Sequence, residues 1–478
     1  MIEDNRNIST DLTSPKGQNV PKRNVPKRTK YPKQKRPKKD KKEGIIMIKK
    51  VAFITLGCKV NQYETNGMAQ KMIEQGYTLV EHHEKADIYI INTCTVTNMS
   101  DRKSRQSLRK VKEQNPEAIV VAVGCYAQVA KEELEKIPEI DLVLGNDEKA
   151  NITQYIEKLL QEKSREDHIN DVMKDLEFTD FGDITFTEKT RAVIKIQDGC
   201  DRFCSYCIIP YARGRVRSRK PESILSEINQ IAQKGIQEVV ITGIHIASYG
   251  KDFEPKLQLI DLLEQINSIS GIKRIRLGSI EPLIITEEFL ARLKPLEKIC
   301  HHFHLSLQSG CDNTLKRMNR RYTTAQFREI VQLLRKFDPE VILTTDIIVG
   351  FPGETEEDFK ITKQFLTEIN FYKMHIFKYS PRKGTKAAQM KEQIDGKLKE
   401  QRSKELIELS NKHQLAYHQT YLGKTVEVLW EEEKEGIFQG HTPNYMLIKS
   451  AEKGLAENQI TSVLCQKATT EAIIAYHE

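Results

Sequence analysis

The sequence predicts an α/β protein made of two arrays of parallel strands and a small antiparallel β-barrel at the C-terminal end. Three observations support this prediction. Apolar strands alternate with helices from residue 49, six further strand–helix units follow from residue 191, and short strands with no helices between them end the chain. Strands that alternate with helices favour parallel sheets, whereas a run of short strands favours a barrel or sandwich.

The first array places a cysteine at the end of each of three strands. We expect strands in KKVAFITLGC, ADIYIINTCTV and AIVVAVGCYAQ, and helices in NQYETNGMAQKMIEQG, SDRKSRQSLRKVKEQN and from EELEKI onward. Open parallel sheets build their sites at the carboxyl ends of their strands, where Cys58, Cys94 and Cys125 fall. Residues 151–185 are polar and mixed, and we expect a helix and a linker there.

The second array has six strands, in RAVIKIQ, EVVITGIHI, IKRIRLGSI, HHFHLSLQS, VILTTDIIVGF and KMHIFKYS, with helical segments between them. Six such units suit a partial or full parallel barrel better than an open sheet. After a helix at 396–419, the segments GKTVEVLWEE, GIFQGHTPNYMLIKS and the last 20 residues read as short antiparallel strands. They predict a small C-terminal β-barrel.

Composition and charge indicate a cytoplasmic protein. The net charge of +8 sits in the N-terminal tail, because residues 1–50 hold 16 Lys+Arg against 5 Asp+Glu. We expect the Pro-rich segment 1–46 to be disordered, with contact to RNA phosphates as the alternative. No apolar run is long enough to span a membrane, and no secretory signal is present. Nine cysteines, an odd count without an export signal, argue for metal binding or catalysis rather than disulfides.

The strongest motif is IQDGCDRFCSYCIIPYARGR, which spaces Cys200, Cys204 and Cys207 as C-x3-C-x2-C directly after a strand. Three thiolates can hold one face of a cubane iron–sulfur cluster and leave one iron without a protein ligand. Zinc usually takes four ligands, and no fourth cysteine or histidine is near in sequence. The alternative is a loop of ordinary buried cysteines.

This motif resembles the radical S-adenosylmethionine superfamily, whose fold is a partial (β/α)6 barrel. The resemblance implies that the methionine end of S-adenosylmethionine chelates the open iron of a [4Fe–4S] cluster. One electron from the cluster then cleaves the sulfonium and yields a 5′-deoxyadenosyl radical. The protein binds and orients these groups and excludes water.

Cys58, Cys94 and Cys125 are too far apart in sequence to form one short motif, and from the residues alone a metal site competes with buried core cysteines. Their surroundings, LGC-x-x-N, NTC-x-V and GC-x-A-Q, are similar to the N-terminal domain of methylthiotransferases. The resemblance implies that these cysteines hold a second [4Fe–4S] cluster, which acts catalytically as the sulfur carrier.

The resemblance to methylthiotransferases extends over nearly the whole chain from residue 49. RIRLGSIEP, HLSLQSGCDNTLKRMNRRY and TDIIVGFPGET are similar to the family's barrel segments, and the C-terminal section resembles a TRAM domain, an RNA-binding β-barrel. KVNQYET, QDGCDRFCSYCIIPYARG and GHTPNYM are most similar to the branch that modifies N6-threonylcarbamoyladenosine in tRNA. The implied domains are a tail (1–46), an N-terminal methylthiotransferase domain (47–150), a linker (151–185), a radical S-adenosylmethionine core (186–416) and a TRAM domain (417–478).

The implied reaction is methylthiolation of C2 of N6-threonylcarbamoyladenosine at tRNA position 37, in two S-adenosylmethionine-dependent steps. Its partners would be tRNA and a reductant such as flavodoxin or ferredoxin, and the enzyme is expected to be a monomer. Three rival functions are methylthiolation of isopentenyladenosine in tRNA, methylthiolation of a ribosomal-protein side chain, and non-catalytic RNA binding by an iron–sulfur protein. A structural cluster normally has a fourth ligand, which argues against the last of these.

Four further residues at barrel strand ends are candidates to bind S-adenosylmethionine, namely Thr242, Gly243, Glu281 and Gln308. The superfamily has a loop near the first two that bonds the methionine amino group, with a plain strand-end turn as the alternative. Asp346 lines the same mouth or is a buried, hydrogen-bonded carboxylate. His301, His302 and His304 are expected to be ordinary surface or core histidines, and Cys300, Cys311 and Cys465 ordinary cysteines.

Three groups of basic residues follow the cysteine segments and are candidates to hold tRNA phosphates, with solvated helix faces as the alternative. They are Arg102, Lys103, Arg105, Arg109 and Lys110; Arg213, Arg215, Arg217 and Arg219; and Lys316, Arg317, Arg320 and Arg321.

Overall fold

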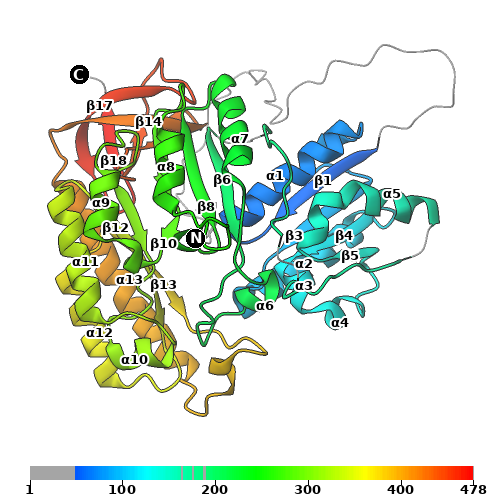
Figure 1. Cartoon of the computed structure of the whole chain (residues 1–478), viewed down its shortest axis with the longest axis horizontal. Helices are drawn as coiled ribbons and strands as arrows, with labels where there is room; N and C mark the ends of the chain where they lie inside the picture. Colours follow the sequence, from blue (N-terminus) through cyan, green and yellow to red (C-terminus); the bar gives the residue numbers. More distant parts are fainter. Residues whose placement is uncertain (1–48, 163–164, 175–176, 187–189, 477–478) are drawn as a thin grey trace, which may run out of the picture.

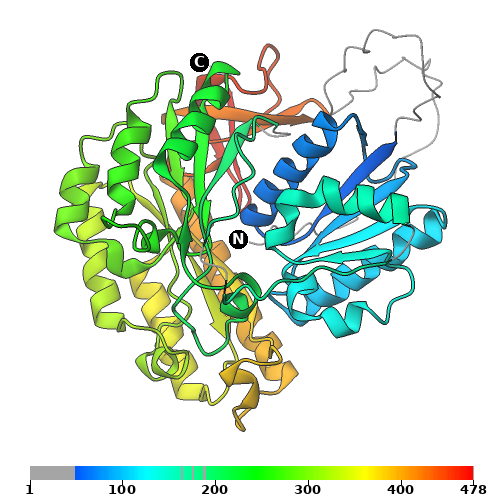
Figure 2. The same ribbon diagram turned by 45° about the vertical axis from the view of Figure 1, so that its right-hand side comes forward.

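The computed structural model describes residues 49–162, 165–174, 177–186 and 190–476, so the expected tail at 1–46 lies outside it. Figure 1 shows three bodies: an N-terminal α/β domain in blue and cyan, a half-open barrel in green and yellow, and a small red β-barrel above it. The rotated view in Figure 2 separates the N-terminal sheet from the barrel strands. The predicted α/β class with a C-terminal β-barrel is confirmed.

The N-terminal domain is an open sheet of five parallel strands in the order β2-β1-β3-β4-β5. The strands are β1 (Lys50–Thr55), β2 (Thr78–Val80), β3 (Ile88–Thr93), β4 (Ile119–Gly124) and β5 (Leu142–Leu144). The three central strands are those predicted. The edge strands β2 and β5 were not predicted, because three residues are too few to show a periodic pattern.

Helices cover both faces of this sheet. They are α1 (Lys59–Glu74), α2 (Asn98–Gln114), α3 (Cys125–Val129), α4 (Lys131–Leu134) and α5 (Ile152–Glu162), with the 3-10 turn η1 (Asp147–Asn151) before α5. Alternate strand residues point to opposite faces, so Ile90 packs with α1 and α5 while Ile91 packs with α2. The helix expected from Glu132 onward is the short α4, which ends before Pro138.

The central domain is a half-open barrel of six parallel strands. They are β6 (Arg191–Asp198), β8 (Glu238–Gly243), a third strand divided into β9 (Arg274–Leu277) and β10 (Ser279–Ile280), β11 (His302–Leu305), β12 (Ile342–Val349) and β13 (Lys373–Lys378). The division at Gly278 separates the sheets β7-β6-β8-β9 and β10-β11-β12-β13, where β7 (Arg217–Ser218) runs antiparallel to β6. The predicted partial (β/α)6 barrel is therefore confirmed.

Helices cover the outside of the barrel. The main ones are α7 (Pro221–Gln233), α8 (Leu259–Asn267), α9 (Glu287–Leu293), α11 (Thr324–Phe337), α12 (Glu356–Ile369) and α13 (Gly396–Gln419). Short elements at the strand ends are α6 (Ile209–Arg213), α10 (Asp312–Arg317), η2 (Ile246–Ser248), η3 (Pro282–Ile284) and η4 (Lys386–Gln389). Outward strand residues such as Phe303, Leu343 and Met374 form the core beneath these helices.

The C-terminal domain is a closed barrel in the order β14-β15-β16-β18-β17. Its strands are β14 (Thr425–Lys434), β15 (Ile437–His441), β16 (Leu447–Ser450), β17 (Ile460–Ala468) and β18 (Ile473–Tyr476). Neighbours are antiparallel except β16 and β18, which run parallel, so the expectation of a fully antiparallel barrel needs this correction. The two strands run in the same direction because β17, which pairs with β14, lies between them along the chain and β18 then returns beside β16.

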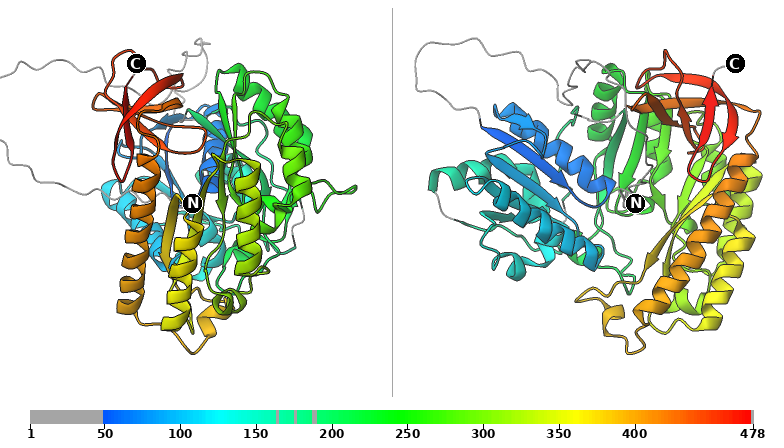
Figure 3. Two further views of the ribbon diagram at one scale, coloured as in Figure 1. Left: turned by 90° about the vertical axis from the view of Figure 1, so that its left-hand side faces the viewer. Right: turned by 180° about the vertical axis from the view of Figure 1, so that it is seen from behind.

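The C-terminal barrel packs against the half-open central barrel, at the end where the strands of the central barrel begin, as the two views of Figure 3 show. The guanidinium of Arg276 donates to the carbonyls of Thr442 and Pro443 at 3.2 and 3.0 Å. The ring of Tyr445 stacks on His302 with 4.5 Å between centroids. The strands of the central barrel finish at the opposite end, where the loop with Cys200, Cys204 and Cys207 follows β6. None of the helices in the described segments has the length and apolar character needed to cross a membrane.

Candidate functional site

The first cysteine set lies at the carboxyl edge of the N-terminal sheet. Cys58 precedes α1, Cys94 follows β3 and Cys125 begins α3 directly after β4. Because β1, β3 and β4 are neighbours, their ends bring the three thiols together. Gly57 has φ +102°, and a Cβ there would lie 2.8 Å from the Cβ of Cys94, so only glycine permits this approach.

The three thiols of this set are close enough to affect one another electrostatically. Burial, with the charges of Cys125 and Cys58, raises the pKa of Cys94 to about 12. Thiolates so close together are stable only beside positive charge. A bound metal cluster supplies such charge, so the residues fit one.

Arg213 links this set to the barrel. This buried side chain belongs to α6, and its Nε donates to the Sγ of Cys125 at 3.2 Å. Its Nη1 donates to Glu64 Oε1 at 2.7 Å and to Asp198 Oδ2 at 2.9 Å. Its Nη2 donates to Asn61 Oδ1 at 2.7 Å. One guanidinium therefore contacts α1, β6 and a cysteine of the first set.

Two buried lysines complete this ion network. Lys149 Nζ lies 2.5 Å from Glu64 Oε2, and Lys195 Nζ lies 2.8 Å from Glu64 Oε1 and 2.5 Å from Asp198 Oδ2. With Arg213, three cations face two carboxylates. Charges taken out of water need partners, and the sulfur of Cys125, which accepts from Arg213, lies beside the remaining positive charge.

The second set lies on the loop after β6, at the top of the half-open barrel. The N–H of Cys200 donates to Gly214 O at 3.0 Å, and that of Cys207 donates to Cys204 O at 2.9 Å, which fixes the loop. Burial raises the pKa of Cys200 to about 11, and the charge of Cys204 adds to the rise. Arg320 Nη1 donates to Cys204 Sγ at 3.4 Å. Each cysteine set is therefore contacted by one arginine.

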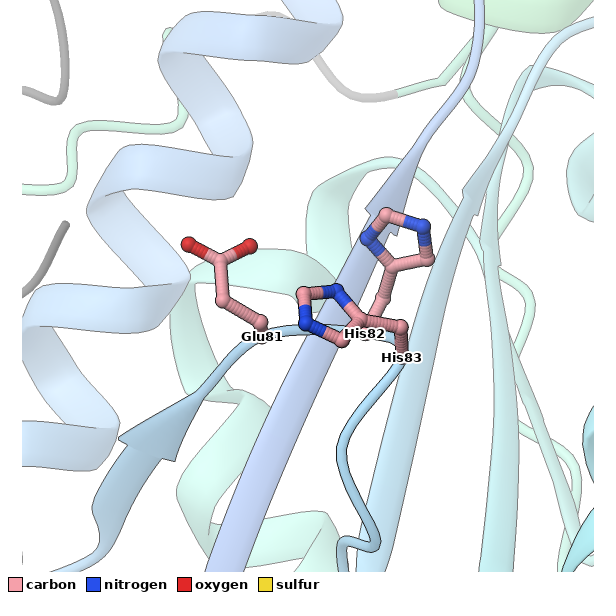
Figure 4. A group of neighbouring side chains, drawn as sticks. All are labelled: Glu81, His82 and His83. Carbon is pink, nitrogen blue, oxygen red and sulfur yellow. The ribbon is translucent and has the colours of Figure 1, made fainter. Parts of the chain in front are cut away.

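The spacing of the cysteines does not suit a single ion. In the described residues, three or more ligand atoms lie within 4.8 Å of one another at two places, and neither includes a cysteine of these sets. One is the exposed group Glu81, His82 and His83 on the loop after β2, shown in Figure 4. The other is His304, Asp346 and His375 in the barrel. Wider thiol spacing fits a cluster of several irons better than one zinc.

The residues expected to bind S-adenosylmethionine lie at the same end of the barrel as Cys200. A Cβ at Gly243 would lie 2.9 Å from Gln197 O, so the backbone approaches closely there. Glu281 Oε2 accepts from Arg202 and, at 3.1 Å, from His245 Nε2. Gln308 has φ +72°, a strained conformation for a residue other than glycine.

Thr242 is buried one residue before Gly243, at the end of β8. Burial would raise the pKa of Glu281, yet His245 and Arg202 hold it at about 2, so this carboxylate is ionised at neutral pH.

The second and third basic groups differ from expectation. Arg213, Arg217 and Arg219 are buried in ion networks, and Arg217 Nη1 lies 2.9 Å from Asp147 Oδ1. Arg320 contacts Cys204, while Arg215, Lys316 and Arg321 remain exposed. The buried arginines cannot hold phosphates, because each already has buried partners. Their roles were not predictable since those partners, Glu64 and Asp147 among them, lie far away in sequence.

A loop after β13 contacts both cysteine segments and was not identified from the sequence. Arg382 Nη2 donates to Thr95 Oγ1 and Asp101 Oδ2, both at 2.6 Å, beside Cys94. The N–H of Ala387 donates to Ser205 O at 2.8 Å, inside the loop of the second set. Residues 380–387 therefore join the two cysteine sets.

Two parts of the chain match known protein families. Residues 50–145 match the family described as "Uncharacterized protein family UPF0004", and residues 194–366 match the Radical SAM superfamily. The "Threonylcarbamoyladenosine tRNA methylthiotransferase MtaB" of Bacillus subtilis is 42% identical over 83% of this chain and 89% of that protein.

A second relative carries a different name. The "tRNA-2-methylthio-N(6)-dimethylallyladenosine synthase" of Caldicellulosiruptor saccharolyticus is 37% identical over 82% of this chain and 85% of its own length. Among solved structures, the radical S-adenosylmethionine methyltransferase TsrM from Kitasatospora setae aligns with a TM-score of 0.51. The alignment covers 69% of this chain and 73% of that one at 14% identity, which supports the fold alone.

Proposed function

Because this chain belongs to the radical S-adenosylmethionine tRNA methylthiotransferases, we propose that it methylthiolates C2 of N6-threonylcarbamoyladenosine at position 37 of tRNA. The enzyme class and the tRNA substrate follow from family membership. The nucleoside is the proposal. It is supported by the name of the 42% identical relative and by the KVNQYET and GHTPNYM segments, which resemble the same branch.

One observation supports the chemistry most directly: the two cysteine sets, on separate domains, are joined by Arg213 and by residues 380–387. Cys200, Cys204 and Cys207 hold the [4Fe–4S] cluster that family membership implies. We assign a second cluster to Cys58, Cys94 and Cys125. When bound, the clusters and S-adenosylmethionine supply a 5′-deoxyadenosyl radical, a methyl group and a sulfur atom.

The protein's own residues stabilise charge at these positions. Arg213 and Arg320 each donate to one cysteine sulfur and so offset the negative charge of the thiolates. Thr242, Gly243, Glu281 and Gln308 surround the mouth of the barrel and are proposed to hold S-adenosylmethionine. The Glu281 carboxylate, ionised and fixed by His245, is suited to accept hydrogen bonds from ribose hydroxyls or the methionine amino group.

RNA binding is assigned to two surfaces. The C-terminal barrel, which resembles a TRAM domain, is proposed to hold tRNA, together with the exposed basic residues of α2 next to Cys94. A reductant such as flavodoxin or ferredoxin supplies electrons, and the enzyme is proposed to work as a monomer.

Mass spectrometry of tRNA nucleosides from a strain lacking this gene tests the assignment. The 2-methylthio derivative of N6-threonylcarbamoyladenosine should disappear and the unmodified nucleoside should accumulate. Loss of the methylthio derivative of isopentenyladenosine instead would support the second relative's activity. Unchanged tRNA with loss of a methylthio group from a ribosomal protein would reassign the substrate class.

A further inference from the structure

A polar group that includes no cysteine lies on the inner face of the barrel. His304, Asp346 and His375 come from the adjacent strands β11, β12 and β13. Asp346 pairs with His375 across β12 and β13, and His304 pairs with Thr344, two residues before Asp346. Paired and i+2 residues share a face of the sheet, so the three side chains point the same way. We call them the lumen triad.

The lumen triad faces the inside of the barrel rather than the helices. The alternate residues Phe303, Leu343 and Met374 pack in the core under the outer helices. His304 is fully buried, while Asp346 and His375 are half-buried. The backbone carbonyl of Asp346 accepts the N–H of Gln308 at 2.9 Å. This places the triad just below the strand ends where S-adenosylmethionine is expected.

The contacts of the triad leave polar atoms for a ligand. Thr344 Oγ1 lies 3.0 Å from His304 Nδ1 and 2.8 Å from His302 Nε2, so one hydroxyl serves both rings. His304 Nε2 lies 3.2 Å from Asp346 Oδ2, at ion-pair distance but without the alignment of a hydrogen bond. Within the described residues, Asp346 Oδ1 is buried and has no hydrogen-bond partner.

The remaining group, His375, is a neutral donor. Burial lowers its pKa to about 4, the charge of Asp346 opposes that shift, and the ring is therefore uncharged at neutral pH. A neutral imidazole has one N–H and one bare nitrogen. The triad thus presents a carboxylate oxygen that accepts and an imidazole that donates, a few ångströms apart, in a site of low dielectric.

We propose that the lumen triad binds the polar N6 substituent of the substrate adenosine and selects threonylcarbamoyl over an isopentenyl group, an inference that rests on the proposed function. C2 and C6 of adenine flank N1, so an N6 substituent extends only a short way from the reacting carbon. When C2 faces the cysteine loops, this substituent enters the neighbouring lumen. A hydroxyl or N–H of threonylcarbamoyl donates to Asp346 Oδ1, and His375 donates to a carbonyl or carboxylate oxygen.

An isopentenyl group has neither donor nor acceptor, so its entry would leave buried polar groups unpaired. Sites that hydrogen-bond a substrate group can reject the analogue lacking it by about 10⁴-fold or more. The selection therefore comes from desolvated polar groups, and removing them should relax it.

The test is a competition in one tube between tRNA bearing N6-threonylcarbamoyladenosine and tRNA bearing isopentenyladenosine, using anaerobically reconstituted full-length enzyme. The ratio of the two methylthio products gives the ratio of kcat/KM values. The variants are His375→Leu, which removes the donor, His375→Gln, which keeps one, and Asp346→Asn, which replaces the acceptor carboxylate. His301→Gln, on the exposed side before β11, is the matched control. Iron content and the cluster spectrum report whether each variant folds.

The wild-type enzyme should favour the threonylcarbamoyl substrate by about 10⁴-fold or more. His375→Leu and Asp346→Asn should each lower that ratio at least tenfold. His375→Gln should restore most of it, and His301→Gln should match wild type.

An unchanged ratio in both His375→Leu and Asp346→Asn overturns the subsite. So does one equivalent of a divalent metal beyond iron that is lost in these variants, because the triad would then be an ion site. Wild-type enzyme that turns over only the isopentenyl substrate overturns the proposed function itself, and the wild-type reaction alone reveals that outcome.

Discussion

The Nε of Arg213 and the Sγ of Cys125 lie 3.2 Å apart across the boundary between the barrel and the N-terminal sheet. The same guanidinium bonds Glu64 and Asp198, so the charge beside this cysteine is fixed by residues of both domains. Arg213 thus couples the position of the barrel to the electrostatics of the first cysteine set. Lysine has a single ammonium group in place of the planar guanidinium with its several fixed N–H donors. Arg213 is therefore difficult to replace by lysine.

Arg213→Lys should weaken the cluster at Cys58, Cys94 and Cys125, because the charge remains while the bond to Cys125 is lost. Iron and sulfide per chain should fall from about eight toward four after reconstitution. The matched control is Arg215→Lys, which changes an exposed arginine two residues away. Full iron content with unaltered cluster spectra in Arg213→Lys would show that this contact is dispensable.

Glu64→Gln should destabilise the protein strongly, since it removes the carboxylate that contacts the buried Lys149 and one of the two carboxylates that contact Lys195. Removing one partner of a buried ion pair costs about 3–5 kcal/mol. Burial would raise the pKa of Glu64, but Arg213 and the two lysines hold it well below its usual value. Its contribution is therefore present above about pH 4 and is lost only as the pH falls through the lower folded-state pKa.

Denaturant unfolding of the wild type, Glu64→Gln and the exposed control Glu74→Gln measures this cost. Equal free energies of unfolding for all three at pH 7 would contradict the assigned network.

Arg382→Ala should uncouple formation of 5′-deoxyadenosine from formation of the methylthio product. The change removes the bonds to Thr95 and Asp101 beside Cys94 but leaves the loop of Cys200, Cys204 and Cys207 intact. Methylthio product formed per 5′-deoxyadenosine should fall about tenfold or more, because a misplacement of about 1 Å can cost about 100-fold. Both products are read from one sample, with the exposed neighbour Lys383→Ala as control. An unchanged product ratio would rule out a positioning role.

Arg102→Ala/Lys103→Ala should weaken tRNA binding without changing which nucleoside is modified. Both side chains are exposed at the start of α2, within two turns of Cys94. Losing two phosphate contacts should reduce the slope of log K against log salt by about 1.5 to 2. Filter binding across a salt series measures the slope, with Lys336→Ala on the outer helix α11 as control. An unaltered slope would place the phosphate contacts elsewhere.

Removal of the C-terminal barrel is a poor test of whether that barrel binds tRNA. Arg276 is buried against Glu238 and donates to the carbonyls of Thr442 and Pro443, so removing residues 420–478 would expose this ion pair and its neighbours. A loss of tRNA binding after truncation would therefore mix unfolding with loss of the RNA surface. Substitution of exposed lysines on the barrel, such as Lys453 and Lys467, separates the two effects.

The strands and their cysteines were predictable because local patterns encode them. An apolar run ending in Cys94 or Cys125 marks a strand and its carboxyl end, and C-x3-C-x2-C places three thiols in one loop. Partners distant in sequence were not predictable. From the sequence Arg213 is one of several candidates to hold phosphates, because nothing near it in sequence shows that it bonds Glu64 and Asp198 in the folded protein.

The lumen triad also depends on partners that are distant in sequence and so could not be predicted. His304 was expected to be an ordinary histidine because its strand offers no ligand at a paired spacing. Only the register of β11, β12 and β13 brings it next to Asp346 and His375. Short elements such as β2 and β5 were missed for a different reason, since three residues carry too little periodicity to be recognised.

The two cysteine sets are proposed to have different roles, radical formation at one and sulfur transfer at the other. Anaerobic turnover of Cys94→Ala with tRNA bearing N6-threonylcarbamoyladenosine tests this difference most directly, with 5′-deoxyadenosine and nucleosides measured in the same sample and Cys204→Ala alongside. Cys94→Ala should form 5′-deoxyadenosine but no methylthio product, and Cys204→Ala should form neither. Methylthiolation at the wild-type level by Cys94→Ala would contradict the assignment of Cys58, Cys94 and Cys125 to sulfur transfer.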